Sequence, residues 1–151
     1  MRRRVAPLLA AIAIASCFGL PHPAVAVPEP PPLTVNVADT DTLGRVLTDP
    51  QGHTLYRYDL ERAGTVGCTG TCADTHKPLL NPPGAELRLP PGIAGTLGTV
   101  TRPDGAHQVT YDGSPLYRST ADLGPGDTNG ADLHWHVINP RNAPVPAGTT
   151  G

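Results

Sequence analysis

The sequence predicts a small all-β domain, a pseudo-symmetric antiparallel sandwich or barrel of about 7–8 short strands built from two hairpin repeats. Three observations predict this class. Glycine and proline, 17 and 19 residues, together make up 36 of the 151 positions, which disfavours long helices. Beyond residue 26, no window of about eleven residues shows a helical apolar stripe. The tripeptide Leu-Tyr-Arg occurs at 55–57 and again at 116–118, each time after a turn that contains Gly or Pro.

Residues 1–26 are predicted to be a signal peptide. Three N-terminal arginines precede an apolar, alanine-rich run, and the sequence AVA at 24–26 has the small-residue pattern of a cleavage site. An alternative stays open, because IASC at 14–17 resembles a lipobox. In that case residues 1–16 would be the lipoprotein signal and Cys17 would be lipidated, which is the one membrane attachment that we expect. Either way the protein is expected outside the cytoplasm, secreted or associated with the cell envelope.

The mature chain is predicted to be mildly acidic. Without the three N-terminal arginines it has 8 basic and 13 acidic side chains, a net charge of 8 − 13 = −5. This charge, together with the lack of a basic cluster in the sequence, disfavours binding to nucleic acid. Because Cys17 belongs to the export segment, Cys68 and Cys72 remain as a pair, and an oxidising compartment favours a disulfide between them. The ring would be short, so we expect it to stiffen a loop rather than the whole domain.

The rest of the chain divides by composition. A Pro-rich tether and a first strand are assigned to 27–41, the β-repeat domain to 42–140, and a flexible tail to 141–151. Residues 81–95 are predicted to be a loop. The predicted strands are 43–48 and 54–59, joined as a hairpin by the turn at 49–52; 97–102 and 107–111, joined by the turn at 103–105; 115–118; and 134–138.

An acid follows the Tyr of each repeated tripeptide by five residues: Glu61 follows Tyr56, and Asp122 follows Tyr117. Aromatic residues are only 4 % of the chain, and the Tyr and Trp residues fall on predicted strands, so Tyr56, Tyr117 and Trp135 are expected in the core. Each acid is expected to accept backbone amides in its own turn. The alternative is a carboxylate dyad formed by the two acids, which would suit hydrolysis.

Five blocks of the chain, in this order, resemble a family of secreted bacterial lipoproteins of unknown function that carries a Y-x-[FWY]-x-x-D repeat. The blocks are LYRYDLE at 55–61, CTGTCADTHKPL at 68–79, GAHQVTYDGSPLY at 105–117, LYRSTAD at 116–122 and PGDTNGADLHWHVINP at 125–140. On this resemblance the repeat-motif residues are Tyr56, Tyr58, Glu61, Tyr117 and Asp122. The resemblance implies an exported, often lipid-anchored all-β domain, and it implies no established activity.

Three positions depart from the family pattern. Glu61 replaces Asp in the first repeat, Ser119 replaces an aromatic residue in the second, and His76-Lys77 replaces Trp-Pro. The last two changes remove apolar rings, so a shared aromatic cluster is expected to be thinner in this chain.

A metal centre is one alternative to the disulfide. Cys68, Cys72 and His76 have the spacing C-x3-C-x3-H, which resembles the ligand loop of the binuclear copper centre in cytochrome oxidase subunits. Leu79 stands where that loop has Met, and the two thiols would have to stay reduced outside the cytoplasm.

Two further groups of side chains are candidate metal ligands. His134 and His136 lie two residues apart on a predicted strand, so they would leave from one face and Trp135 would point to the core. The competing interpretation is an exposed strand face. The loop DTNGAD at 127–132 offers several oxygens, as calcium sites do, but it lacks the later Glu of an EF-hand. Asx turns explain the same residues.

The sequence contains no G-x-S-x-G, P-loop or dinucleotide fingerprint. We therefore expect an exported cell-envelope β-repeat domain that is not an enzyme, a binding or structural module without a cofactor. Its partner would be an envelope component or a small ligand. The alternative function is copper binding or electron transfer through Cys68, Cys72 and His76.

Overall fold

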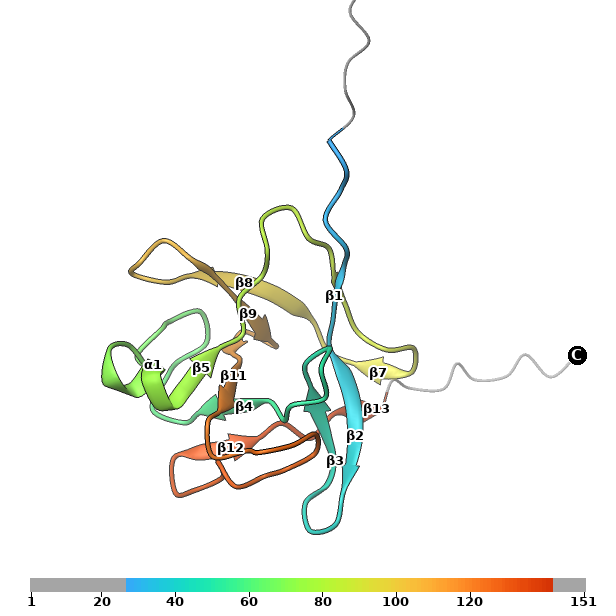
Figure 1. The fold of residues 1–151 in the computed structure, drawn as a ribbon, viewed down its shortest axis with the longest axis vertical. Helices are drawn as coiled ribbons and strands as arrows, with labels where there is room; N and C mark the ends of the chain where they lie inside the picture. Colours follow the sequence, from blue (N-terminus) through green and yellow to red (C-terminus); the bar gives the residue numbers. More distant parts are fainter. Residues whose placement is uncertain (1–26, 143–151) are drawn as a thin grey trace, which may run out of the picture.

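A computed structural model describes residues 27–142, so the predicted signal peptide and most of the predicted tail lie outside the described residues (Figure 1). The described chain is almost entirely short strands, with one helix, α1 (Thr71–Thr75). The strands are β1 (Leu33–Thr34), β2 (Asn36–Thr40), β3 (Gly44–Thr48), β4 (Tyr56–Tyr58), β5 (His76–Pro78), β6 (Leu87–Arg88), β7 (Ile93–Ala94), β8 (Leu97–Thr101), β9 (His107–Tyr111), β10 (Ser114–Pro115), β11 (Tyr117–Ser119), β12 (Trp135–Val137) and β13 (Arg141–Asn142).

These strands form several small sheets. A four-stranded sheet has the order β12-β4-β11-β5, and a three-stranded sheet has the order β10-β9-β8. The remaining pairs are β2 with β3, β7 with β13, and β1 with β6, of which only the last is parallel. Within residues 27–142 no sheet closes on itself, so the sandwich is the correct form of the predicted all-β fold and the barrel is not.

The number of strands exceeds the prediction. The described residues contain 13 strands, of which five (β1, β6, β7, β10 and β13) have only two residues, so 13 − 5 = 8 longer strands remain. Two of the short strands, β6 and β7, lie inside the segment predicted to be a loop, and β13 takes the first two residues of the predicted tail. Each is held by a partner far along the chain, which composition alone does not reveal. Helix α1 is also new, a single turn too short to give a periodic pattern.

The predicted hairpin of 43–48 with 54–59 forms only beside its turn, and its strands then take other partners. Strand β3 pairs with β2, from Asn36 opposite Thr48 to Thr40 opposite Gly44, whereas β4 pairs with β11 and β12. The predicted turn does form, since the Gly52 amide donates to the Asp49 carbonyl at 3.0 Å. Next to it the two segments are joined by the bridge between Thr48 and Thr54 and by the hydrogen bonds from Asp49 N to the His53 carbonyl and from Leu55 N to the Leu47 carbonyl, at 2.9 and 2.8 Å. The second predicted hairpin is confirmed as β8 and β9.

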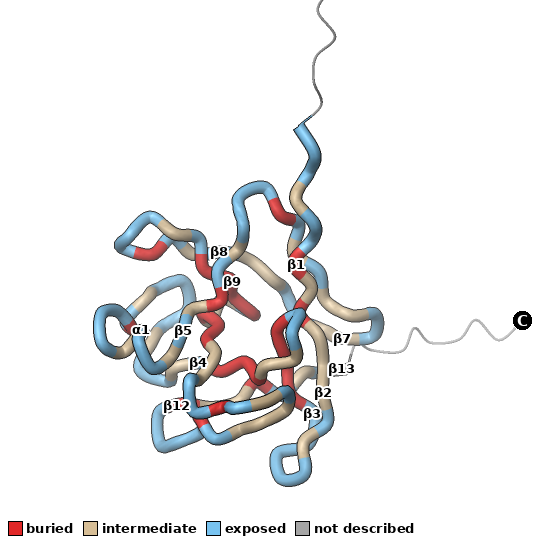
Figure 2. The backbone as a smooth tube through the Cα atoms, in the orientation of Figure 1, coloured by how far each residue is buried: buried red, intermediate tan, exposed pale blue. Residues whose placement is uncertain are grey.

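Two buried clusters lie on opposite sides of the repeated tripeptides. In each repeat the Leu enters an aliphatic cluster and the neighbouring Tyr enters an aromatic cluster, because successive strand residues face opposite ways. Leu55, Tyr56, Leu116 and Tyr117 are all fully buried. Figure 2 shows the buried segments running together through the centre of the domain. The scarce aromatic rings are thus used in the core, as predicted.

The two repeats exchange strands. In the first, backbone hydrogen bonds link Leu55 to Leu47, Leu47 to Ile138 and Ile138 back to Leu55, at 2.8–3.1 Å. The same three-membered pattern links Leu116, Val109 and Leu79 at 2.8–2.9 Å. Ile138 directly follows β12, and Leu79 directly follows β5. The first repeat is therefore completed by a strand from the end of the chain, and the second by a strand from the middle.

Candidate functional site

The repeat tyrosines and acids form two crossed pairs. Tyr56 donates its hydroxyl hydrogen to Asp122 Oδ2 at 2.7 Å, and Tyr117 donates to Glu61 Oε1 at 2.6 Å. The two tyrosines lie directly opposite each other on β4 and β11. Each Tyr is therefore bonded to the acid of the other repeat, a partner that sequence offsets within one repeat do not indicate.

Each acid also accepts backbone amides, as the sequence predicts. Glu61 Oε1 accepts the N–H groups of Gly67 and Cys68 at 2.7 and 2.9 Å, and Asp122 Oδ1 accepts the N–H of Gly130 at 3.3 Å. Because the two carboxylates serve different tyrosines and different loops, the structure uses them as separate crosslinks.

Burial keeps the two tyrosine hydroxyls of these pairs protonated. It raises the pKa of both Tyr56 and Tyr117 above the ordinary value of 10, and the neighbouring carboxylates act in the same direction. Burial likewise raises the pKa of Asp122. The tyrosines therefore remain hydrogen-bond donors at neutral pH.

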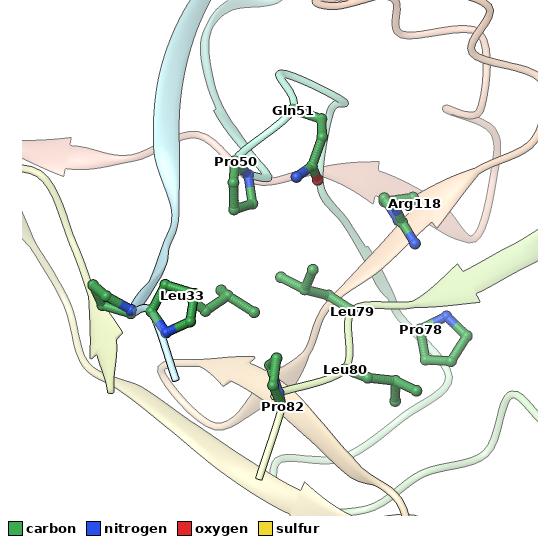
Figure 3. Close-up of a pocket in the computed structure, with 10 residues that line it drawn as sticks. Leu33, Pro50, Gln51, Pro78, Leu79, Leu80, Pro82 and Arg118 are labelled. Carbon is green, nitrogen blue, oxygen red and sulfur yellow. The ribbon is translucent and has the colours of Figure 1, made fainter. Parts of the chain in front are cut away.

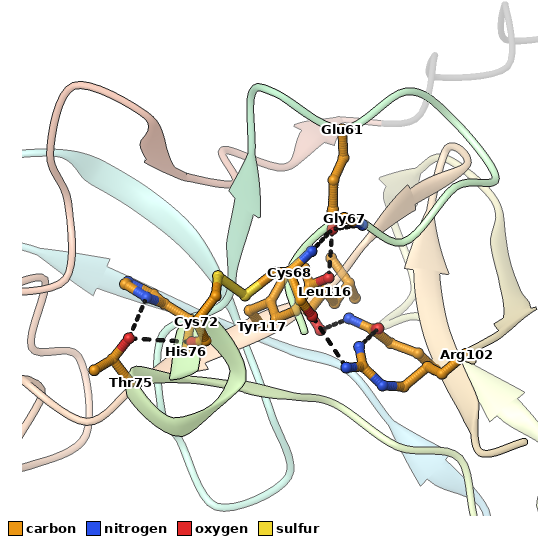
Figure 4. Close-up of a disulfide and its surroundings, with 10 residues drawn as sticks. Glu61, Gly67, Cys68, Cys72, Thr75, His76, Arg102, Leu116 and Tyr117 are labelled. Carbon is orange, nitrogen blue, oxygen red and sulfur yellow. Dashed lines mark hydrogen bonds between the residues drawn. A yellow bond between two sulfur atoms is a disulfide. The ribbon is translucent and has the colours of Figure 1, made fainter. Parts of the chain in front are cut away.

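Cys68 and Cys72 are joined by a disulfide, as the sequence predicts (Figure 4). Cys68 is fully buried against the aromatic cluster, and Cys72 lies on α1. Since both sulfur atoms are engaged in this bond, they are not thiolates, and the copper alternative would require its reduction. The disulfide instead closes the loop whose amides bind Glu61.

A buried polar network continues from the disulfide. Arg102 donates to the Cys68 carbonyl at 3.0 Å and to Gln108 Oε1 at 2.5 Å, and Gln108 Nε2 donates to the Leu116 carbonyl at 2.8 Å. Arg102 is 5 % exposed and Gln108 is fully buried. Arg102 directly follows β8, and Gln108 lies on β9. Because both side chains are polar, the sequence did not indicate that they would be buried.

His76 is part of an aromatic stack rather than a free ligand. Its ring lies parallel to that of Trp135, with centroids 3.7 Å apart and planes 1° apart, while Tyr58 stacks on Trp135 at 4.6 Å. Its Nδ1 is 3.2 Å from the Thr75 hydroxyl, and its Nε2 is buried without a hydrogen-bond partner. Burial lowers the pKa of His76. His76 thus contributes its ring to the stack with Trp135 and Tyr58.

His134 and His136 share one face of β12 and both contact Asp59. The Nδ1 of His134 is 3.1 Å from Oδ1 of Asp59, and the Nε2 of His136 is 3.4 Å from Oδ2. Trp135 between them is buried, as predicted. Within residues 27–142 there is no group of at least three His, Cys, Asp or Glu side chains that could hold a metal ion.

The acids of the 127–132 loop bind backbone. Asp127 Oδ2 accepts the amides of Leu123 and Gly124, both at 2.9 Å, and Asp132 Oδ1 accepts those of His134 and Trp135. These two amides lower the pKa of Asp132. The contacts of Asp132 are those of an Asx-type turn, which the sequence offered as the alternative to calcium, whereas Asp127 accepts amides that precede it in the chain.

A second site, which the sequence analysis did not single out, surrounds Arg118. A hollow of about 240 Å³ is lined by His53, Lys77, Arg118, Ser119 and Asp122. Arg118 also lines a cavity of about 460 Å³ whose other walls are prolines, leucines and Gln51 (Figure 3). We call the hollow and the cavity together the Arg118 site. In sequence, Arg118 is the third residue of the second Leu-Tyr-Arg repeat, so it lies on the face of β11 opposite the buried Tyr117.

The fold and these contacts define an all-β domain with a disulfide, in which two related segments are crosslinked by tyrosine–carboxylate pairs. Residues 98–139, which include β9 to β12, match a family described as a secreted repeat of unknown function. This match confirms, for that part of the chain, the family predicted from the sequence. Comparison with curated proteins and with solved structures gave no match. The described part of the chain has no helix with the length and apolar character needed to span a bilayer.

Proposed function

We propose that the chain is an extracytoplasmic, non-catalytic binding module of the cell envelope. The observation that carries this proposal is the use of the repeat acids. Glu61 and Asp122 are the carboxylates that a hydrolase reading would need, and each accepts a Tyr hydroxyl and backbone amides. Both oxygens of Asp122 and Oε1 of Glu61 are engaged by donors, and Glu61 Oε2, which has no partner, is closed to solvent. Carboxylates held in this way are poorly placed to accept a further proton from substrate or water. The repeat acids therefore stabilise the folded structure.

A binding role is supported by the Arg118 site. Its cavity of about 460 Å³ falls in the range of small-molecule sites, and its walls are mainly apolar with few polar groups. The aromatic cluster, by contrast, is filled by its own rings. The surface around Arg118 is thus suited to a ligand.

The location and the chemistry need separate tests. Mass spectrometry of the exported protein without reductant is expected to show a disulfide between Cys68 and Cys72, and either cleavage after Ala26 or a lipid on Cys17. A protein retained in the cytoplasm with free thiols would contradict the proposed location.

For the binding role, ¹⁵N-labelled protein is titrated with defined envelope components, namely peptidoglycan fragments and lipids in nanodiscs. Shifts are expected around Arg118, and the added component should be recovered chemically unchanged. Chemical conversion of a component, abolished by Glu61→Gln or Asp122→Asn in a folded variant, would replace the proposal with an enzymatic function. The copper alternative is tested on reduced protein, where a colourless titration with copper would count against it.

A further inference from the structure

Two cationic side chains lie side by side on the four-stranded sheet. Arg118 of β11 is directly opposite Lys77 of β5 in the antiparallel register, so both project from the face opposite Tyr117. Their side chains are 37 % and 49 % exposed. His53, 39 % exposed, lines the same hollow.

The acids near these cations are buried and already bonded. Asp49 is fully buried and accepts four donors: the amides of Gln51 and His53, the His53 ring and Arg118. Asp122, 9 % exposed, is held by its Tyr and an amide, as described above. The exposed Asp74 lies 3.8 Å from Lys77, a distance at which an exposed pair is weak. The groups that a ligand would meet are therefore mainly cationic.

Arg118 retains a donor without an acceptor. Its Nη1 donates to Asp49 Oδ2 at 3.2 Å, which fixes the guanidinium, while its buried Nε has no hydrogen-bond partner. Because this Nε is closed to solvent, a ligand oxygen would meet the other N–H groups of the guanidinium, on the part of the side chain that is exposed. The planar guanidinium fork matches an oxyanion, which Lys77 would contact from the neighbouring strand.

The cavity of about 460 Å³ that Arg118 also lines is mainly apolar. Leu79, Leu80 and Pro82 follow β5, and Pro50 and Leu33 complete much of the wall (Figure 3). Arg118 is the charged residue in this wall. A molecule that enters the cavity and reaches the hollow thus passes from apolar to cationic surroundings at Arg118.

We propose that the Arg118 site binds an amphipathic anion: an oxyanion head group, carboxylate or phosphate, at Arg118 and Lys77, and a short alkyl chain in the cavity beside Leu79 and Leu80. This inference rests on the proposed function, for which it supplies the class of ligand. Arg118 binds the head group, and Asp49, which is itself bonded to His53, holds Arg118 in place.

The first test is calorimetric titration of the full chain, with the disulfide intact, with decanoate, octanoate and hexanoate below their micelle concentrations. Each loss of two methylenes is expected to weaken binding about 15-fold, because each buried methylene contributes about 0.8 kcal/mol. Decanol should bind at least about tenfold more weakly than decanoate, since it lacks the charge that Arg118 pairs. Decyl phosphate in parallel distinguishes the two head groups, and decyltrimethylammonium should not bind.

Arg57 provides a matched control, because it is the Arg of the other Leu-Tyr-Arg repeat and its replacement changes the net charge equally. Arg118→Gln is expected to weaken decanoate binding by about tenfold or more, and Arg57→Gln to leave it within about twofold. Since Arg118 also holds buried Asp49, each variant is checked for an unchanged unfolding midpoint. The exposed Lys77→Gln is a second variant that keeps this contact, and it is expected to weaken decanoate binding several-fold.

Three results would overturn the inference: no binding of decanoate or decyl phosphate, equal affinity for decanol, or equal loss in the Arg57 and Arg118 variants. None of these would contradict a binding module for another envelope component. Conversion of decanoate or decyl phosphate to a product, in contrast, would contradict the non-catalytic function itself.

Discussion

The crossed pairing of repeats can be measured as a coupling energy. Tyr56→Phe removes the hydroxyl that donates to Asp122 Oδ2 at 2.7 Å, in a side chain that is fully buried. Hydrogen bonds to charged groups contribute about 1.5–3 kcal/mol, and Asp122 would keep only the longer contact to Gly130. We therefore expect Tyr56→Phe to lower the free energy of unfolding by about 2 kcal/mol.

The double variant separates this bond from general packing. Asp122→Asn weakens the same contact, so Tyr56→Phe combined with Asp122→Asn should cost at least about 1 kcal/mol less than the sum of the single variants. Glu61 is the matched control, because it lies in the same repeat as Tyr56 but bonds Tyr117 instead. Tyr56→Phe with Glu61→Gln should be additive within about 0.5 kcal/mol.

The assay is urea unfolding of the disulfide-linked protein, followed by tryptophan fluorescence, with the four variants of each cycle measured under one condition. Coupling between Tyr56 and Glu61 with additivity between Tyr56 and Asp122 would refute the crossed arrangement. It would favour two repeats that each satisfy their own acid.

Three further predictions concern the surrounding loops. Because burial lowers the pKa of His76 below its ordinary value of 6.5, the unfolded chain binds this proton more readily, and stability should fall as pH drops through 6.5. His76→Phe should keep the stacked ring and reduce that loss between pH 7 and 5 in urea titrations; identical pH profiles would contradict the stated cause. A Cβ at Gly130 would lie 2.2 Å from the Ser119 Cβ, so Gly130→Ala should cost about 1–3 kcal/mol in unfolding experiments. Ser119→Gly in the same chain should restore most of it, and absence of rescue would mean that another contact is limiting. Replacing both Cys68 and Cys72 with Ser opens a ring of five residues and should lower the unfolding free energy by about 2 kcal/mol, measured against the oxidised protein; an unchanged midpoint would show that the bond constrains little.

Local turn chemistry was the part of the fold that the sequence could reveal. The β8–β9 hairpin was predictable because its turn at 103–105 closes between adjacent strands, and Gly105 there has φ +84°. The turn at 49–52 carries an equally strong signal, but it redirects the chain, since the Asp49 side chain accepts the amides of Gln51 and His53. A turn motif therefore fixes a change of direction without fixing which strands pair.

Side-chain partners were less predictable than burial. The aromatic residues expected in the core are there, and the disulfide follows from two nearby cysteines in an oxidising compartment. The acceptors of Tyr56 and Tyr117 were not predictable, because each lies in the other repeat, more than 50 residues away along the chain. Arg118 was missed for a related reason, since its neighbour Lys77 comes from a strand whose partner local sequence does not specify.

The exchange of β5 and β12 between the repeats has a consequence for how the chain can be divided. Neither half contains the strand that completes its own three-way backbone pattern, so a fragment with one repeat would expose unpaired backbone groups. Two copies of such a fragment could satisfy each other by the same exchange, forming a symmetric dimer with the geometry of the intact chain. The single chain thus resembles two such fragments joined covalently. Its folding cannot be completed until β12, which lies near the end of the chain, has been synthesised.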